Sequence, residues 1–386
     1  MASLLDQIDW CDVPLLPAVS DPAWEKEVVR RFGFASNMAA FLTPVRWLME
    51  AEQLVEARVT PSISVPLRAF ISMAVAMDSS CRHCYGAFRS MLKILGYSEN
   101  VIRELEESLA VEDLTAKEQA ALEFARKVSR SAPRPGASDL VELKVAGFSQ
   151  LEIAEIAYLA AVNAAGNRLA TLLAVPPDPL EEIDANWFER LKRPFTRREF
   201  RVALSYVVNV PYPAGFVGPG AGIVRALEGS PASAALATIL DGAWNSTITS
   251  RRVKALIFAV IARGLSCPAC EAEASAALRA EGWNDPEVQH VLTYLTSDKL
   301  DAFEQKVLSF ARETVRYPAT ARTRAVICEG SQAGGPAGDC WMGLVYQRPG
   351  PHEHLAPSIL IRPRALISLP ARSMIGSFKS AIVSGG

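Results

Sequence analysis

A repeat at a spacing of 186 residues is the feature that most constrains the fold of this chain. Shifting the sequence by 186 positions places Cys81 on Cys267 and Cys84 on Cys270. Without a gap, the same shift aligns LTAKEQAALEFAR in the first copy with LDAFEQKVLSFAR in the second. One offset that holds from residue 68 to about residue 130 indicates two tandem copies of one domain, since repeats at a fixed spacing reflect repeated structure.

The first copy has the residue pattern of a helical domain. Arg68–Met77 is apolar and too short to span a membrane, so we expect a buried core helix. A second helix is predicted from Cys81 to about Leu95, capped by the Ser-Ser pair before it and stopped by Gly96. The LTAKEQAALEFARKVSR segment has a helical apolar stripe, which predicts a third helix.

A long helix, Phe148–Leu173, closes the first copy, with Ser149 and Glu152 as its capping box. In the second copy we expect Ser266 to cap the cysteine helix and Pro268 to lie in its first turn, where no backbone N–H is needed. The predicted fold class is therefore all-α.

Four segments are expected along the chain of 386 residues. The first helical domain covers residues 1–175, and a Pro-rich connector covers 176–220. The second domain, 221–320, is predicted to be incomplete, because the atypical tail, 321–386, is rich in Gly and Pro where a closing helix is expected. A change of reading frame in the gene would account for this tail.

Composition excludes several classes of protein. The net charge is −2 and the pI about 6.2, so no basic excess supports nucleic-acid binding. The first twenty residues lack the pattern of a secretion signal, and no run of about 18 apolar residues predicts a membrane span. We expect a soluble cytoplasmic protein with no nucleic-acid or membrane partner.

The two Cys-x-x-Cys pairs are the chemical signal in the sequence. Four of the seven cysteines form these pairs, and closely spaced pairs in a reducing compartment point to redox or metal chemistry. On a helix, positions i and i+3 share a face, and a helix N-terminus favours a thiolate over a thiol. His83, between the first two thiols, is placed to hold or move a proton, whereas the second copy has Ala269 there. Two alternatives are inert thiols and a four-thiolate zinc site, which would require both pairs to converge.

The stretch AVAMDSSCRHCYGAF, within this repeated helical pattern, resembles the alkylhydroperoxidase D (AhpD)-like and carboxymuconolactone decarboxylase superfamily. The resemblance covers about residues 30–175 and 220–320. It implies an all-α fold duplicated in tandem, a homo-oligomer (a trimer of tandem domains) and peroxidase activity through the cysteines. It also implies that Cys84 is attacked by peroxide and that Cys81 is its proton donor and resolving partner. The helix dipole alone favours Cys81 as the more acidic thiol, so both assignments stay open.

The chain departs from the family at its proton relay. The family uses a glutamate twelve residues before the first cysteine and a histidine four after the second. These positions hold Ala69 and Phe88 in the first copy and Ala255 and Ala274 in the second. A missing base implies a loss on the order of 10²–10⁴-fold in proton-transfer assistance.

Three functions are consistent with these patterns. The first is a thiol-dependent, peroxiredoxin-type peroxidase with an antioxidant role, which takes a hydroperoxide and a thiol reductant and needs neither cofactor nor metal. Its site residues are Cys81, His83, Cys84, Cys267 and Cys270. The second is a catalytically degenerate helical module for assembly or binding, and the third is a decarboxylase-like lyase.

Overall fold

The computed structural model describes residues 18–32, 38–43, 59–108, 114–130, 135–177, 218–247 and 249–316, with single positions 45, 47, 48, 51, 111, 181, 210, 213 and 216. Over these residues every regular element is a helix, so the all-α prediction is confirmed. The helices before residue 200 are α2 (Pro22–Phe32), α3 (Met38–Leu42), α5 (Val65–Asp78), α6 (Arg82–Leu95), α7 (Glu99–Glu107), α8 (Ala116–Arg130), α9 (Ala137–Val145) and α10 (Gln150–Leu173). Those after it are α12 (Ala221–Ala226), α13 (Pro231–Asn245), α14 (Arg251–Gly264), α15 (Pro268–Ala280), α16 (Asp285–Tyr294) and α17 (Ala302–Arg316).

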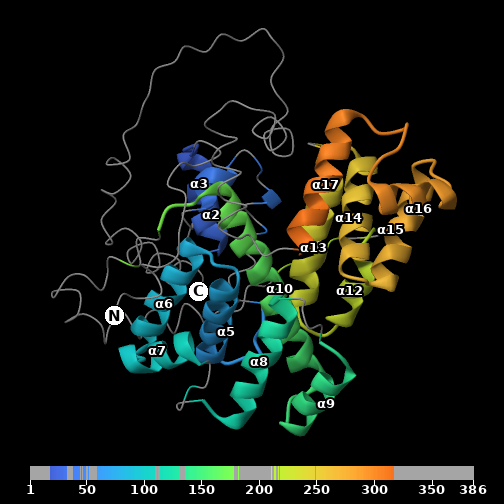
Figure 1. The fold of residues 1–386 in the computed structure, drawn as a ribbon. Coiled ribbons are helices and arrows are strands. Elements are labelled where there is room, and N and C mark those ends of the chain that lie inside the picture. Colours follow the sequence, from blue (N-terminus) through green and yellow to red (C-terminus); the bar gives the residue numbers. More distant parts are fainter. Residues whose placement is uncertain are drawn as a thin grey trace.

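Two sets of four helices follow one another in the same order (Figure 1). We call α5–α8 unit 1 (residues 65–130) and α14–α17 unit 2 (residues 251–316). Each helix of unit 2 begins 186 residues after its counterpart in unit 1. The packing corresponds as well, because α5 lies against α6 and α8, and α14 lies against α15 and α17. The spacing found in the sequence is therefore also the spacing of the helices.

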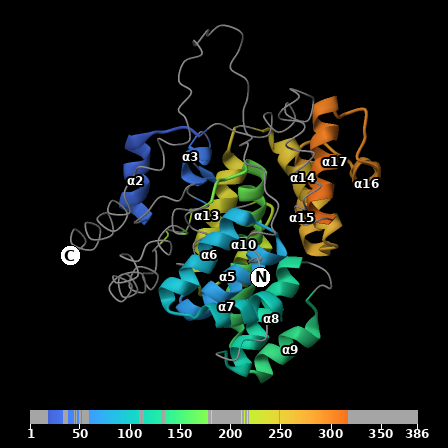
Figure 2. The same ribbon diagram turned by 60° about the vertical axis from the view of Figure 1, so that its left-hand side comes forward.

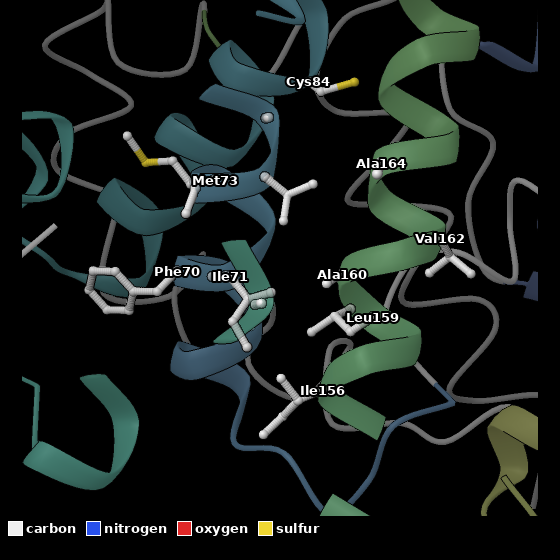
Figure 3. Close-up of a cluster of buried hydrophobic side chains, with 14 of the residues drawn as sticks. Phe70, Ile71, Met73, Cys84, Ile156, Leu159, Ala160, Val162 and Ala164 are labelled. Carbon is white, nitrogen blue, oxygen red and sulfur yellow. The ribbon is translucent and has the colours of Figure 1, made fainter. Parts of the chain in front are cut away.

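Helix α5 is the centre of unit 1. Ser64 caps it through a hydrogen bond from the Leu67 N–H, and every residue from Leu67 to Ala76 is buried. Figure 3 shows Phe70, Ile71 and Met73 of α5 in the apolar cluster, which extends across to α10. This confirms the predicted core helix, and it fixes the end of α5 next to the first cysteine pair.

Helix α10 closes unit 1 along its length, packing against α5, α6 and α8. It begins with the capping box of Ser149 and Glu152 that the sequence predicts. Helix α13 lies beside α10 in both views (Figures 1 and 2), and its Ala232 and Ala235 belong to the same apolar cluster as α5 and α10. The two halves of the chain thus share a core at α10 and α13.

The glutamate of the repeated E-Q motif begins a helix in both units. In unit 1 the Thr115 N–H donates to the Glu118 carboxylate, and the Glu118 N–H donates to the Thr115 hydroxyl. Asp301 and Glu304 make the same reciprocal pair at the start of α17. A capping box satisfies two backbone donors that a helix start leaves open, which explains why both copies keep the acidic residue.

Within the described ranges, no helix has the length and apolar character needed to cross a bilayer. The sequence-based predictions for residues 321–386, and for most of the connector 176–220, fall outside the described residues.

Candidate active site

The first cysteine pair lies where α5 ends and α6 begins. Ser80 adopts a left-handed conformation (φ +50°), and the Cys81 N–H donates to the Ala76 carbonyl, which ends α5. Cys81 is itself the N-cap of α6, with its sulfur accepting a hydrogen bond from the Cys84 N–H at 3.3 Å. The prediction that the Ser-Ser pair caps this helix is therefore wrong, because Ser80 terminates the preceding helix instead.

Unit 2 repeats this turn. Ser266 is left-handed (φ +44°), the Cys267 N–H donates to the Ala262 carbonyl, and the Cys267 sulfur accepts from the Cys270 N–H at 3.4 Å. The predicted Ser266 cap is thus also wrong, for the same reason. Pro268 does lie in the first turn of α15, as expected.

The two sulfurs of the first pair face each other. The Sγ atoms of Cys81 and Cys84 are 2.7 Å apart, and both cysteines are thiols. Cys81 is only 1% exposed and Cys84 is 9% exposed. Figure 3 shows the Cys84 sulfur at the side of α6 that faces α10. The pair is therefore placed to form a disulfide, and Cys84 is the thiol nearer to the surface.

The surroundings of Cys81 favour its thiolate. Burial alone raises the pKa of a thiol, because it penalises the charged form. Here the hydrogen bond from the Cys84 thiol, the positive charge of His83, the Cys84 N–H and the Thr171 hydroxyl outweigh burial. Together they lower the pKa of Cys81 from 9.0 to about 7. The surroundings of Cys81 therefore favour its ionisation near neutral pH.

His83 is held by the chain that follows α10. Its Nδ1 lies 2.7 Å from the carbonyl oxygen of Pro176. A carbonyl can only accept, so the Nδ1–H of His83 donates this hydrogen bond. The ring is buried beside the thiols, so its orientation is fixed by a contact that spans 93 residues of sequence.

A second contact from the same stretch of chain lies on α6. Arg82 forms a bidentate ion pair with Glu181, with distances of 2.8 and 2.9 Å. The Glu181 carboxylate rests on Gly86, where a Cβ atom would overlap it. Glu181 and Gly86 escaped the sequence analysis, since a pair 99 residues apart leaves no local pattern.

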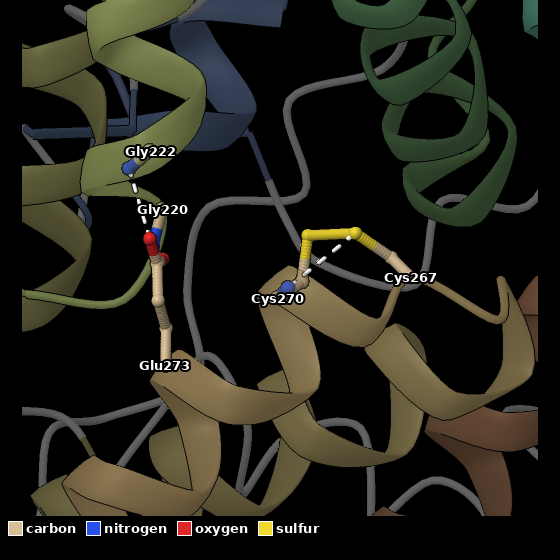
Figure 4. The surroundings of a disulfide bond; sticks show 5 residues. All are labelled: Gly220, Gly222, Cys267, Cys270 and Glu273. Atoms are coloured by element: carbon tan, nitrogen blue, oxygen red, sulfur yellow. Dashed lines mark hydrogen bonds between the residues drawn. A yellow bond between two sulfur atoms is a disulfide. The ribbon is translucent and has the colours of Figure 1, made fainter.

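The second cysteine pair differs from the first in chemistry and exposure. Cys267 and Cys270 form a disulfide and are partly exposed, whereas the first pair is buried (Figure 4). Ala269 occupies the position of His83. Figure 4 also shows Glu273 accepting hydrogen bonds from the N–H groups of Gly220 and Gly222, 2.6 and 2.9 Å away.

The positions of the family's proton relay are apolar and packed in the structure. Ala69, Ala255 and Ala274 are buried in the helix cores, and Phe88 packs against the first core cluster. No group of three or more His, Cys, Asp or Glu residues gathers within the described part of the chain in a way that would hold a metal ion. The two cysteine pairs therefore do not converge there on a shared zinc site.

No family model and no curated protein matches the sequence. Among solved structures, the alkylhydroperoxidase AhpD core of an uncharacterized peroxidase-related protein from Ralstonia eutropha JMP134 is similar at 21% identity, with a TM-score of 0.37. The match covers 45% of this chain and 94% of that one. The chemistry available to the site therefore rests on its own geometry.

Proposed function

We propose that this protein is a thiol-dependent peroxidase that reduces hydroperoxides through Cys81 and Cys84. The observation that carries the proposal is the pair of sulfurs 2.7 Å apart at the start of α6, with the pKa of Cys81 lowered to about 7. A thiolate beside a second thiol suits the reduction of a peroxide, because the thiolate can take the proton of the attacking thiol and the two sulfurs can then close as a disulfide. The resemblance of the AVAMDSSCRHCYGAF stretch to the AhpD-like group supports the same chemistry.

The proposed reaction divides the roles between the two sulfurs. The Cys84 sulfur attacks the terminal peroxide oxygen while its proton passes to the Cys81 thiolate. The O–O bond breaks, the alcohol leaves with a proton from solvent, and Cys84 becomes a sulfenic acid. Cys81 then attacks the Cys84 sulfur and releases water, which leaves a disulfide. Two equivalents of a thiol reductant restore the dithiol and leave as their own disulfide.

The two units suggest a common origin, but they differ in their expected contribution to the peroxidase activity. We infer that they arose by tandem duplication, which the equal spacing of four helices, their caps and their left-handed serines supports. Cys267 and Cys270 are a second redox pair in this proposal. His83 has no equivalent there, so the peroxidase activity belongs mainly to unit 1.

The test is peroxide consumption combined with thiol analysis of each pair. After one equivalent of peroxide, we expect the peptide that holds Cys81 and Cys84 to lose two hydrogens in mass and to resist alkylation. Cys84→Ser should abolish turnover with any thiol donor. The double variant Cys267→Ser/Cys270→Ser is the matched control and should retain most of the activity. If Cys81 and Cys84 both remain alkylatable after stoichiometric peroxide, the peroxidase proposal is wrong and a non-catalytic module is the better description.

A further inference from the structure

The two residues between the first pair of thiols are both held by the chain that follows α10. Arg82 forms its bidentate ion pair with Glu181 at 2.8 and 2.9 Å, and the Nδ1–H of His83 donates to the Pro176 carbonyl at 2.7 Å. The side chains of Arg82 and Glu181 are only 16% and 17% exposed, so water screens this ion pair less than it screens a surface pair. The contact therefore fixes Arg82 more firmly than an ordinary surface salt bridge does.

Unit 2 lacks the side chains that make these contacts, although its cysteine turn is the same. The positions of Arg82, His83 and Gly86 hold Pro268, Ala269 and Ala272, which are all exposed. Neither proline nor alanine can form an ion pair or donate a side-chain hydrogen bond. The turn of unit 2 still has the left-handed serine and the cysteine N-cap. The contacts made by unit 1 are therefore not required for the turn to form, and their role lies in the surroundings of the first thiols.

Glu181 contacts α6 on the side that faces away from α10. Its carboxylate pairs with Arg82 and rests on Gly86, and residues four apart share one face of a helix. Cys84 is two residues from each of them and so lies on the opposite side, where Figure 3 shows its sulfur facing α10. The first turn of α6 is therefore held between α10 on one side and Glu181 on the other.

We propose that Glu181 is a positioning residue for the first cysteine pair. Through Arg82 it holds the first turn of α6 against α10, and this keeps Cys81 beside the Thr171 hydroxyl and the His83 ring. Both neighbours favour the Cys81 thiolate, which takes the proton of Cys84 in the proposed reaction. The inference rests on the proposed peroxidase function and assigns a part in it to a residue that touches neither the thiols nor the peroxide.

The test is the thiolate absorbance of Cys81 in full-length Glu181→Ala, taken as the difference from the same variant with Cys81→Ser. Charge and position predict opposite results. Removal of the carboxylate leaves the positive charge of Arg82 unpaired, which by itself would move the inflection to lower pH. Loss of positioning moves it to higher pH, because Cys81 loses the neighbours that favour its thiolate. We expect a rise of about 0.5–1 pH unit, with the pH dependence of kcat/KM moving by the same amount.

Two further variants separate position from charge. Gly86→Ala displaces the Glu181 carboxylate without removing any charge, so it should also raise the inflection, and it should add nothing in the Glu181→Ala background. Glu181→Gln removes the same charge as Glu181→Ala but keeps an oxygen that accepts from Arg82, so its inflection should lie nearer to that of the native protein. Glu271→Ala breaks the matched ion pair with Arg263 in unit 2 and is the control that should leave the Cys81 inflection unchanged.

The outcomes distinguish this inference from the peroxidase proposal. An inflection that rises in both Glu181→Ala and Gly86→Ala, in a protein that consumes no peroxide, supports the positioning role and refutes the peroxidase. Peroxide consumption with an inflection that stays the same or falls in Glu181→Ala overturns the positioning role and leaves the peroxidase standing. Equal inflections in Glu181→Gln and Glu181→Ala, or a similar rise in Glu271→Ala, also overturn the inference.

Discussion

The ionisation of Cys81 offers the sharpest test of the site. A pKa of about 7 leaves roughly half of this thiol ionised at pH 7, whereas its ordinary value of 9.0 would leave about 1% ionised. The thiolate population is thus raised about 50-fold by the Cys84 hydrogen bonds, His83 and Thr171. Because the pKa of Cys81 is lowered, its thiolate accumulates as the pH rises through 7 and is protonated as the pH falls below 7.

The assay is the ultraviolet absorbance of thiolate between pH 5 and 10, taken as the difference between the native protein and Cys81→Ser. Absorbance needs no access for a reagent, which matters for a side chain that is 1% exposed. We expect an inflection near pH 7. In His83→Gln the inflection should move to higher pH, because the nearby positive charge is gone. A Cys81 inflection at 8.5 or above, unchanged in His83→Gln, would refute the reasoning.

Two further predictions concern stability, measured by chemical denaturation. Gly86→Ala should lower the free energy of unfolding by about 1 kcal/mol, because the new methyl group displaces the Glu181 carboxylate. In the Glu181→Ala background the same change should raise the free energy of unfolding by about 0.5–1 kcal/mol, because only the higher helix propensity of alanine remains. An effect of the same sign in both backgrounds would contradict the contact between Gly86 and Glu181. In unit 1, Asp78 forms an ion pair with Arg126, and the counterparts of these residues in unit 2 are Gly264 and Arg312, whose Nε is buried without a partner in the described structure. Gly264→Asp should therefore stabilise by about 0.5–1 kcal/mol more than Gly264→Ala, and an equal gain in both variants would exclude an ion pair with Arg312.

Local signals in the sequence predicted the helices well. The apolar run of α5, the Gly96 stop of α6 and the Ser149 capping box of α10 depend on residues within one or two turns of one another, and all three are confirmed. The turn between α5 and α6 was predicted incorrectly. A serine before a helix usually caps it. In the sharp connection here, Ser80 instead belongs to the end of α5, and Cys81 is the N-cap of α6.

Contacts between distant residues were beyond the sequence. The cysteine pairs were found because both thiols lie in one turn, and His83 because it lies between them. Nothing near His83 indicates that Pro176 holds its ring, since that contact depends on how α10 returns toward α6. The same applies to Arg82, whose ion pair with Glu181 spans 99 residues of sequence.

The two units allow the effect of the turn to be separated from the effect of its surroundings. Both cysteine pairs have the same left-handed serine, the same N-cap and nearly the same hydrogen bond to the first sulfur. A helix start is therefore common to both and cannot by itself distinguish their reactivity. The neighbouring residues differ. In the described structure, only the first pair has Thr171 of α10 beside it and a histidine between its thiols. If the turn alone activated a thiol, the pairs would react alike with peroxide once reduced. If the neighbours supplied by α10 and His83 are decisive, reduced Cys267 and Cys270 should react more slowly than the first pair, in spite of their greater exposure.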